Sequence, residues 1–434
     1  MENKTPKEKI ALLAIFILIV AILGALAFLV YSGRGGAVGE KVKTFLPFGS
    51  GGEPREGGEI IPPDTTGGGI IEGSPAEKIL KKLHNAPVAG LYPFTRTQQG
   101  QKTSTSTLDT IVRYIERGLG HIYETNMTTP EEEIRISNET RLKIYEALWG
   151  NGGSGVAIRY LSDDENNSIR TYSITLRDIK NGTTTDEGRL VDSSGVFLRE
   201  NISDAVVSKG KGDKIFYILP IEDSSIGVIT SFGGEKQSQL FSSPLREWLP
   251  QWPKDSLITL TTKASGSVSG LLYFLDAQSG KLTKILGGIT GLTTNTNPTG
   301  DHVLYSESAR GNFNLFSYSI SANEQTPLSL KTLPDKCVWS KLKKTLVYCG
   351  VPTNIPSGEY PDVWYQGVVS FSDTLWMIDT ETGITTILAK PQDLTGEEID
   401  ATQLVLDPNE SFLFFINKKD STPWSLKLTG AELR

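Results

Sequence analysis

The spacing of two cysteines, Cys337 and Cys349, carries the clearest chemistry in this chain. Apolar, strand-forming residues surround both, and a hairpin centred on Lys343 would place them opposite each other. Cross-strand Cβ atoms lie about 4.5–5.5 Å apart, close to the separation that a disulfide needs. The spacing therefore predicts a Cys337–Cys349 disulfide, provided that the chain reaches an oxidising compartment. Two buried free thiols are the alternative.

The segment 350–373 combines turn-forming residues with large aromatic rings. Long loops that interrupt a regular fold tend to be functional. Tyr and Trp provide a large contact area at little cost in side-chain entropy. We predict a binding role for six residues: Glu359, Tyr360, Asp362, Trp364, Tyr365 and Phe371. The alternative is that the rings only hold the segment against the domain beneath it.

No catalytic or metal-binding signature stands out in the rest of the chain. The three histidines, His84, His121 and His302, are far apart in the sequence, and we interpret each as a surface or turn residue. The segment 266–270 has the glycines of a nucleophile elbow, but Val268 occupies the nucleophile position. The acidic loop 163–167 has oxygen donors that suit calcium without the spacing of a calcium loop. We therefore predict no catalytic residue, no metal site and no cofactor.

Composition narrows the class of partner. The chain has 434 residues, 38% of them hydrophobic, and a formal net charge of −7. Nucleic-acid binding requires a concentrated basic surface. The sequence has no long basic run, so we predict that nucleic acid is not a partner.

The N-terminus carries the signal of a membrane anchor. Residues Ile10–Val30 contain no charged side chain, and Lys4, Lys7 and Lys9 precede them. A helix of that length spans about 30 Å, the thickness of a bilayer's hydrocarbon core. The positive-inside rule places residues 1–9 in the cytoplasm, a single transmembrane helix at 10–31 and the remaining chain outside. A cleaved signal peptide is the alternative, because residues 25–27 have the small-x-small pattern of a cleavage site.

Residues 32–73 are rich in Gly and Pro and poor in large apolar side chains. Such a segment cannot bury enough surface to offset its ordering entropy, so we expect a flexible linker. Ser74 as N-cap and Pro75 at the first helical position then predict a short helix that carries Leu80 and Leu83 on one face. The folded domain is predicted to occupy 74–434.

A repeated pattern in the C-terminal half indicates the fold of that domain. A polar turn followed by an apolar run occurs at 253–260, 298–305 and 408–416, and the first two copies are a little over forty residues apart. A period of that size, built from strands, is typical of a β-propeller with one four-stranded blade per repeat. We predict an all-β propeller of about seven four-stranded blades, with six or eight as alternatives.

The same pattern predicts where blades begin and how the ring closes. We expect inner strands to start near six positions: Val156, Ile215, Leu257, Val303, Leu346 and Phe412. The residues around 108–137 supply one further blade. The last blade runs out near Leu428, one strand short, and we expect an N-terminal strand near 88–94 to complete it and protect its edge.

The stretch 297–306, followed by 312–316 in the place of a middle strand, resembles the repeat of TolB-like and WD-repeat-like propellers. Residues 407–410 look like a second copy. The resemblance covers about 250–430 and concerns the fold. It implies a surface on which partners or ligands dock, and it transfers no catalytic residue.

Two hypotheses of function follow. In the first, the chain is a membrane-anchored extracytoplasmic propeller of the cell envelope that acts as a non-catalytic binding or scaffolding module for a protein or glycan. In the second, it is a propeller hydrolase or lyase that acts on envelope glycans through carboxylates near the channel. A ligand sensor that signals inwards is disfavoured, because only residues 1–9 precede the predicted span.

Overall fold

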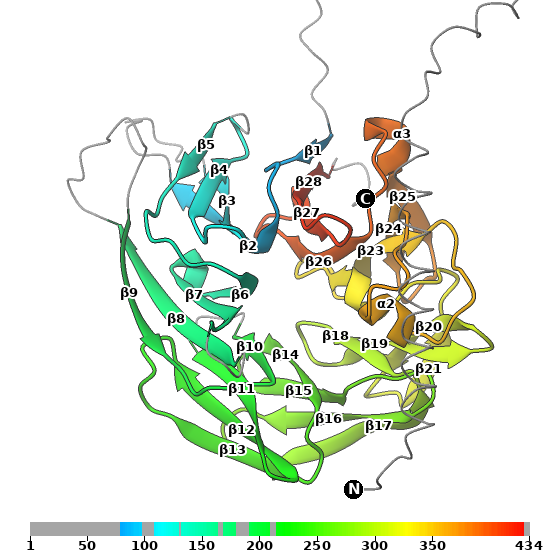
Figure 1. The fold of residues 1–434 in the computed structure, drawn as a ribbon. Coiled ribbons are helices and arrows are strands. Elements are labelled where there is room, and N and C mark those ends of the chain that lie inside the picture. Colours follow the sequence, from blue (N-terminus) through cyan, green and yellow to red (C-terminus); the bar gives the residue numbers. More distant parts are fainter. Residues whose placement is uncertain are drawn as a thin grey trace, which may run out of the picture. The chain divides into compact units, whose positions relative to one another are not determined.

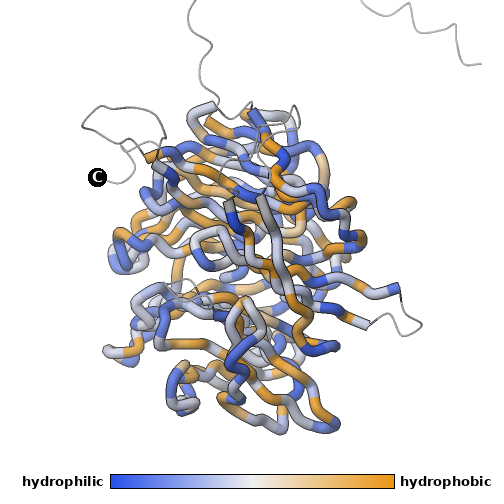
Figure 2. The backbone as a smooth tube through the Cα atoms, turned by 90° about the vertical axis from the view of Figure 1, so that its left-hand side faces the viewer, coloured by the Kyte–Doolittle hydropathy of each residue, from blue (hydrophilic) through white to orange (hydrophobic). Residues whose placement is uncertain are grey.

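Short apolar runs separated by turns build the described part of the chain almost wholly from antiparallel strands. The computed structural model describes residues 79–97, 108–129, 132–163, 168–178, 191–208 and 214–428. Strand β11 (Lys214–Ile221) is rich in Ile, Phe and Tyr and is buried along most of its length. Branched and aromatic side chains of this kind pack well on a pleated surface. In Figure 2, orange apolar and blue polar segments succeed each other along the tube.

The described residues form seven four-stranded antiparallel sheets, which confirms the predicted propeller and its blade number. From the innermost strand outwards, blade 1 is β2 (Val88–Thr97), β3 (Leu108–Glu116), β4 (Ile122–Asn126) and β5 (Glu133–Arg135); blade 2 is β6 (Ile144–Gly150), β7 (Gly155–Leu161), β8 (Ile169–Asp178) and β9 (Val191–Phe197); blade 3 is β10 (Asp204–Val207), β11, β12 (Ser224–Ser231) and β13 (Ser238–Ser243). Blade 4 is β14 (Trp248–Lys254), β15 (Leu257–Thr262), β16 (Ser269–Asp276) and β17 (Leu282–Thr290); blade 5 is β18 (Thr293–Thr296), β19 (His302–Ala309), β20 (Asn312–Ser319) and β21 (Glu324–Pro327). Blade 6 is β22 (Cys337–Trp339), β23 (Leu346–Pro352), β24 (Asp373–Asp379) and β25 (Thr385–Ala389); blade 7 is β26 (Ala401–Leu406), β27 (Phe412–Asn417), β28 (Pro423–Lys427) and β1 (Leu80–Lys82).

The blades follow one another around a ring in chain order (Figure 1). The first strands of neighbouring blades contact each other, as β2 does with β6 and β10 with β14, so these strands surround the axis. The ring closes where β1 pairs with β28, with Leu80 opposite Leu426. The outer strand of the last blade therefore comes from the N-terminal side of the domain.

The predicted inner strands are displaced by one position. The strands that begin near Val156, Ile215, Leu257, Val303, Leu346 and Phe412 are the second strands of their blades. Second strands are buried on both faces because neighbouring blades cover them, so they have the strongest apolar signal. The innermost strand precedes each of them.

The prediction for the closing strand was wrong in its position. Residues 88–97 pair with β3 as the innermost strand of blade 1, and Leu80–Lys82 closes the ring instead. The helix expected from Ser74 onwards is contradicted at Leu80–Lys82, where the chain is extended. A run this short has no decisive periodicity, and its conformation is set by its partner β28.

The hydrophobic core is divided among the junctions between blades. In the described part of the chain, each of the seven junctions has a buried cluster that draws residues from both of its blades. At the junction of blades 6 and 7, for example, Leu346 and Tyr348 pack with Leu413 and Phe415. Outer strands such as β21 are exposed. Stability therefore depends on blade-to-blade packing.

Helices are few and short among the described residues. They are the 3-10 turns η1 (Asn151–Gly153) and η2 (Pro334–Lys336) and the helices α2 (Asp362–Tyr365) and α3 (Pro391–Thr395). Within the described ranges, none of the helices has the length and the apolar composition of a membrane span. The predicted transmembrane helix at 10–31 and the linker at 32–73 lie outside the described residues.

Ring closure by β1 gives a first prediction. The Leu80 side chain is 3% exposed, whereas that of its neighbour Ile79 is 38% exposed. Leu80→Ala is expected to lower the free energy of unfolding by about 2–5 kcal/mol, because it leaves a cavity at the closing seam. Ile79→Ala, as the matched control, is expected to change it by about 0.5 kcal/mol or less. Urea denaturation followed by tryptophan fluorescence measures both, and equal effects would contradict the closure by β1.

Candidate functional site

One end of the propeller collects the elements that could meet a ligand. Because adjacent strands are antiparallel, the innermost strands begin at the same end as the loops between second and third strands. The connections between successive blades reach this end too. We call it the loop face. The insertion, residues 353–372 between β23 and β24, belongs to it and contains α2.

The insertion starts in blade 6 and reaches back over blade 5 to blade 4. Gly358 N donates to Gly311 O (3.0 Å) in the β19–β20 turn of blade 5. Gly266 N, in the β15–β16 loop of blade 4, donates to Asp362 Oδ2 (2.5 Å). A Cβ at Gly266 would lie 2.7 Å from Tyr360 O, so this close approach requires glycine. The insertion therefore bridges three blades.

Three of the predicted binding residues hold the insertion in place. Tyr360, Trp364 and Phe371 are 1%, 4% and 1% exposed and form one cluster with Phe313 and Leu333. The rings of Tyr360 and Phe313 meet edge to face at a centroid distance of 5.0 Å, and those of Trp364 and Phe371 stack at 6.3 Å. This packing is what the alternative interpretation of the loop expected for these rings.

The other predicted residues are accessible. Glu359 is exposed, Asp362 is half-buried, and Tyr365 is 36% exposed. Val368, which the prediction did not include, is 72% exposed. A partner that contacts the insertion therefore meets Glu359, Tyr365 and Val368.

A fully buried ionic cluster lies beneath the insertion. Lys336, Asp373 and Asp400 have 0% exposed side chains. Lys336 Nζ is 2.8 Å from Asp373 Oδ2, forms a short ion pair with Asp400 Oδ1 and donates to Ala401 O (3.1 Å). Asp400 Oδ2 also accepts from Trp364 Nε1 (2.9 Å), so the cluster is joined to the insertion.

Near the axis, Tyr365 of the insertion meets Asp335 of η2. The Tyr365 hydroxyl donates to Asp335 Oδ1 (3.0 Å). Solvent reaches both side chains, yet the protein packed around them raises the pKa of each above its ordinary value. The charge of Asp335, and to a lesser degree that of Asp204, adds to the rise in the pKa of Tyr365. Asp204 begins β10 in blade 3.

A second carboxylate pair lies at the start of the innermost strands of blades 2 and 3. Arg159 Nη1 donates to Glu146 Oε2 (2.5 Å), and Arg159 Nη2 donates to Ile202 O (2.7 Å). Burial, and then the charge of Glu146, raise the pKa of Asp204 to about 7, while Arg159 opposes the rise. A carboxyl group whose pKa is raised in this way can serve as a proton donor near neutral pH.

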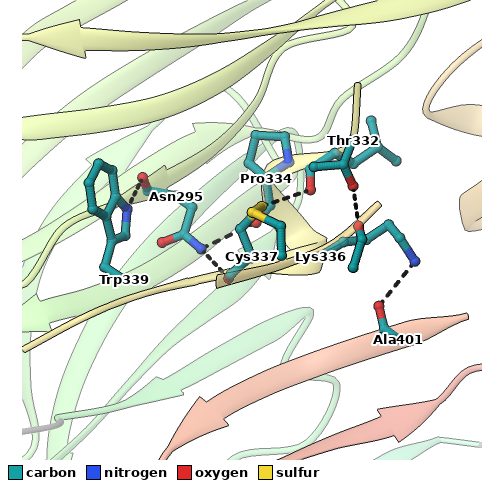
Figure 3. The surroundings of a disulfide bond; sticks show 10 residues. Asn295, Thr332, Pro334, Lys336, Cys337, Trp339 and Ala401 are labelled. Atoms are coloured by element: carbon teal, nitrogen blue, oxygen red, sulfur yellow. Dashed lines mark hydrogen bonds between the residues drawn. A yellow bond between two sulfur atoms is a disulfide. The ribbon is translucent and has the colours of Figure 1, made fainter. Parts of the chain in front are cut away.

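The two cysteines belong to the strands that follow η2 in blade 6. A disulfide joins Cys337 of β22 to Cys349 of β23, with the Cα atoms 4.1 Å apart. The strand register places the two residues opposite each other, as the predicted hairpin requires. Asn295 of blade 5 holds this region from the other side: its side-chain Nδ2 donates to Cys337 O (2.7 Å), and its main-chain oxygen accepts from Trp339 Nε1 (3.0 Å) (Figure 3).

The described residues contain no group of three or more His, Cys, Asp or Glu side chains that could hold a metal ion. His84 Nδ1 is 2.6 Å from Glu133 Oε1, and His302 Nδ1 is 3.0 Å from Asp301 Oδ1. His121 is 9% exposed at the start of β4. Most of the acidic loop 163–167 lies outside the described residues.

The axial residues Glu146, Asp204 and Asp335 were missed in the sequence. Each lies in or next to an innermost strand, and these strands were not recognised as innermost. Such residues could have been found in the sequence as acidic residues that lie shortly before the strongly apolar second strand of a blade.

Sequence comparison assigns no family. No known protein-family profile matches the chain. Probable transcriptional regulatory proteins of Actinobacillus pleuropneumoniae and Haemophilus ducreyi are 33% identical to it over 137 residues, which are 30% of this chain and 48% of each relative. The chain spans about half the length of the curated relatives it matches.

Comparison with solved structures shows likeness of fold alone. An oligogalacturonate lyase in complex with manganese aligns with a TM-score of 0.48 and 9% identity, over 81% of this chain and 100% of the lyase. TolB from Acinetobacter baumannii aligns with a TM-score of 0.39 and 8% identity, over 78% and 80%. The β-propeller domain of Cps50 (Swd1) from Myceliophteria thermophila aligns with a TM-score of 0.44 and 10% identity, over 81% and 100%. The chain is thus similar in fold to TolB and to other propeller domains.

The bridge from blade 6 to blade 4 gives a second prediction. Gly266→Ala would place a Cβ 2.7 Å from Tyr360 O, and overpacking of this kind costs about 1–3 kcal/mol. We expect chymotrypsin to cleave the folded protein after Tyr365 about tenfold faster, because cleavage follows the population of the open insertion. Gly233→Ala is the matched control, since its nearest neighbouring atom is 3.8 Å from the added Cβ. Equal cleavage of both variants and the wild type would contradict the bridge.

Proposed function

We propose that this chain is a membrane-anchored, extracytoplasmic binding module, and that a protein or glycan of the cell envelope docks on its loop face. One observation carries the proposal. The insertion is fixed across three blades by buried rings and a buried ion cluster, while Glu359, Tyr365 and Val368 stay exposed. An element held rigidly in this way loses little entropy on binding, which favours affinity.

The apolar span at 10–31 supports the proposed location. The Cys337–Cys349 disulfide supports it too, because disulfides persist mainly in oxidising compartments outside the cytoplasm. In this proposal, the N-terminal helix anchors the chain and the linker 32–73 separates the propeller from the bilayer.

The chemistry of the loop face suggests what it recognises. Tyr365 is exposed, and Asp335, Asp204 and Glu146 supply carboxyl groups in or next to innermost strands. Carboxylates accept hydrogen bonds from ammonium, guanidinium and hydroxyl groups alike. Basic side chains of a protein and hydroxyl groups of a glycan both fit this description.

The docking proposal predicts that a charge introduced at the loop-face end of blade 6 weakens partner binding, whereas the same change at the opposite end does not. Val368 in the insertion is 72% exposed, and Ile384, in the turn at the opposite end of the blade, is 66% exposed. Full-length wild type and the variants Val368→Asp and Ile384→Asp are to be cross-linked in membranes, solubilised gently and captured. We expect Val368→Asp to reduce the captured partner at least about tenfold, because a buried interface charge without a partner is costly. Ile384→Asp is expected to capture as much as the wild type.

Two results would overturn the docking proposal. The first is that the wild type captures no protein or glycan. The second is that both variants reduce capture equally, which would remove the insertion from the interface.

A second candidate function is a hydrolase or lyase that acts on envelope glycans. The pair formed by Asp204 and Glu146 favours it, because the pKa of Asp204 is raised to about 7, as general-acid catalysis near neutrality requires.

This candidate is tested with the purified full chain and envelope polysaccharides, by following new reducing ends and unsaturated products. If the chain is an enzyme, Asp204→Asn is expected to reduce the turnover rate by about 10²-fold or more. Asp223→Asn, a change of an exposed carboxylate in the β11–β12 turn, is the matched control. Absence of turnover in the wild type would leave the binding module as the function.

A further inference from the structure

The ion cluster beneath the insertion has an unbalanced charge. Lys336 supplies one ammonium, whereas Asp373 and Asp400 supply two carboxyl groups, and all three side chains are 0% exposed. With both carboxyl groups ionised, the cluster carries a net negative charge away from water. Such a charge is costly to bury, and a proton removes it.

Asp373 is the group that can take up this proton. Both oxygens of Asp400 are occupied: Oδ1 by Lys336, and Oδ2 by Trp364 Nε1 (2.9 Å) and Phe371 N (3.0 Å). Asp373 Oδ2 accepts from Ala401 N (2.7 Å) and faces Lys336. Asp373 Oδ1 is buried without a hydrogen-bond partner in the described part of the chain.

Other charged groups near Asp373 have their own partners: Asp335 of η2 bonds to Tyr365, and Asp362 of α2 bonds to Gly266 N. Strands β23, β25 and β26, which pack near it, carry no charged side chain. Asp393 of α3, the helix that packs on β24, is exposed. Lys418 lies beyond the Trp364 ring, 5.2 Å from its centroid, and interacts with Lys336 and Asp400.

The insertion forms the cover of this cluster. The rings of Trp364 and Phe371 each lie 5.4 Å from Lys336 Nζ, and both residues donate to Asp400. Lifting the insertion would break these two hydrogen bonds and admit water to Asp373. The charge state of the cluster and the seating of the insertion are therefore coupled.

We propose that Lys336, Asp373 and Asp400 form a proton-linked latch, in which uptake of one proton by Asp373 tightens the hold of the insertion on the propeller. The proton comes from solvent and binds at Oδ1. The ammonium of Lys336 then pairs with Asp400 alone, and the cluster becomes neutral. Loss of the proton restores the buried negative charge and weakens the hold of the insertion on the propeller. The latch does not depend on the docking function, because it concerns the insertion itself.

The direction of the pH dependence follows from linkage. Burial, and then the charge of Asp400, raise the pKa of Asp373 from its ordinary value of 3.8 to about 6, against the opposing effect of Lys336. The seated state thus binds the proton more tightly than the lifted state, in which water restores the ordinary pKa. Seating is favoured below about pH 6, and this advantage is lost as the pH rises through 6. Between pH 7.5 and pH 5, the equilibrium shifts about tenfold towards the seated state.

Hydrogen exchange of the full-length protein tests the latch. The informative amides are those of Tyr365, Val369 and Phe371, which are hydrogen-bonded within the insertion or to Asp400. After correction for the intrinsic pH dependence of exchange, we expect their protection to be about tenfold greater at pH 5 than at pH 7.5. Amides of β15 serve as an internal control and are expected to show no such change.

Matched variants identify the group that titrates. Asp373→Asn removes the charge and keeps an oxygen for Ala401 N, so the protection of the insertion is expected to be independent of pH and close to the wild-type value at pH 5. Asp379→Asn, the same change at the far end of β24, is expected to behave as the wild type. Equal wild-type protection at both pH values would overturn the latch. So would a tenfold dependence that persists in Asp373→Asn. If that variant does not fold, the wild-type profile measured against β15 still decides.

Discussion

Closure of the ring is the constraint on which the rest of the structure depends. Without closure, blade 7 would have only three strands, and the buried side chains of β28, such as Leu426, would lose the cover that Leu80 gives them. Here β1, a strand of only three residues, pairs with β28 and completes blade 7. Because the N-terminal side of the domain supplies this outer strand, every later blade begins with its innermost strand. Because the strands of each blade are antiparallel and follow one another in chain order, all innermost strands start at the same end of the ring, and this end is the loop face.

Residues far apart in the chain meet because the loop face is shared by all blades. Glu146 and Asp204 come from blades 2 and 3, and Asp335 precedes the innermost strand of blade 6. The insertion then brings Tyr365 to Asp335, to which its hydroxyl donates. It reaches this position because blade 5 has a short β19–β20 turn, over which the insertion passes to Gly266 of blade 4. Because the blades are arranged in a ring, an insertion in blade 6 can contact blades 5 and 4 as well.

The repeat in the sequence predicted the fold and the number of blades, but not the order of strands within a blade. The strongest apolar runs are second strands, such as β23, in which all seven residues are buried. Innermost strands are weaker in sequence: β18 consists of three threonines and one asparagine, and β14 contains two prolines. Individual large side chains on these strands, such as Trp252 of β14 and Trp149 of β6, are buried between blades, but they do not form a continuous apolar run. The axial carboxyl groups on these strands were therefore missed, whereas the insertion was visible because its rings are unusual for a loop.

Three consecutive residues show how closely the parts of the loop face are linked. Asp335 bonds to Tyr365 near the axis, Lys336 enters the buried cluster towards blade 7, and Cys337 is bonded to the second strand of its own blade. A buried ion pair is seldom worth more than an apolar contact of the same volume, so stability alone does not explain Lys336. The position of Lys336 explains it better. The single turn η2 carries both Asp335, near the axis, and Lys336, beneath the insertion. The disulfide fixes this turn on one side, and Asn295 fixes it on the other. Tyr365 and Trp364 belong to the same short helix and contact adjacent residues of that turn, Asp335 and Lys336. A movement of the insertion that displaces Trp364 from the buried cluster therefore also displaces Tyr365 from Asp335 near the axis.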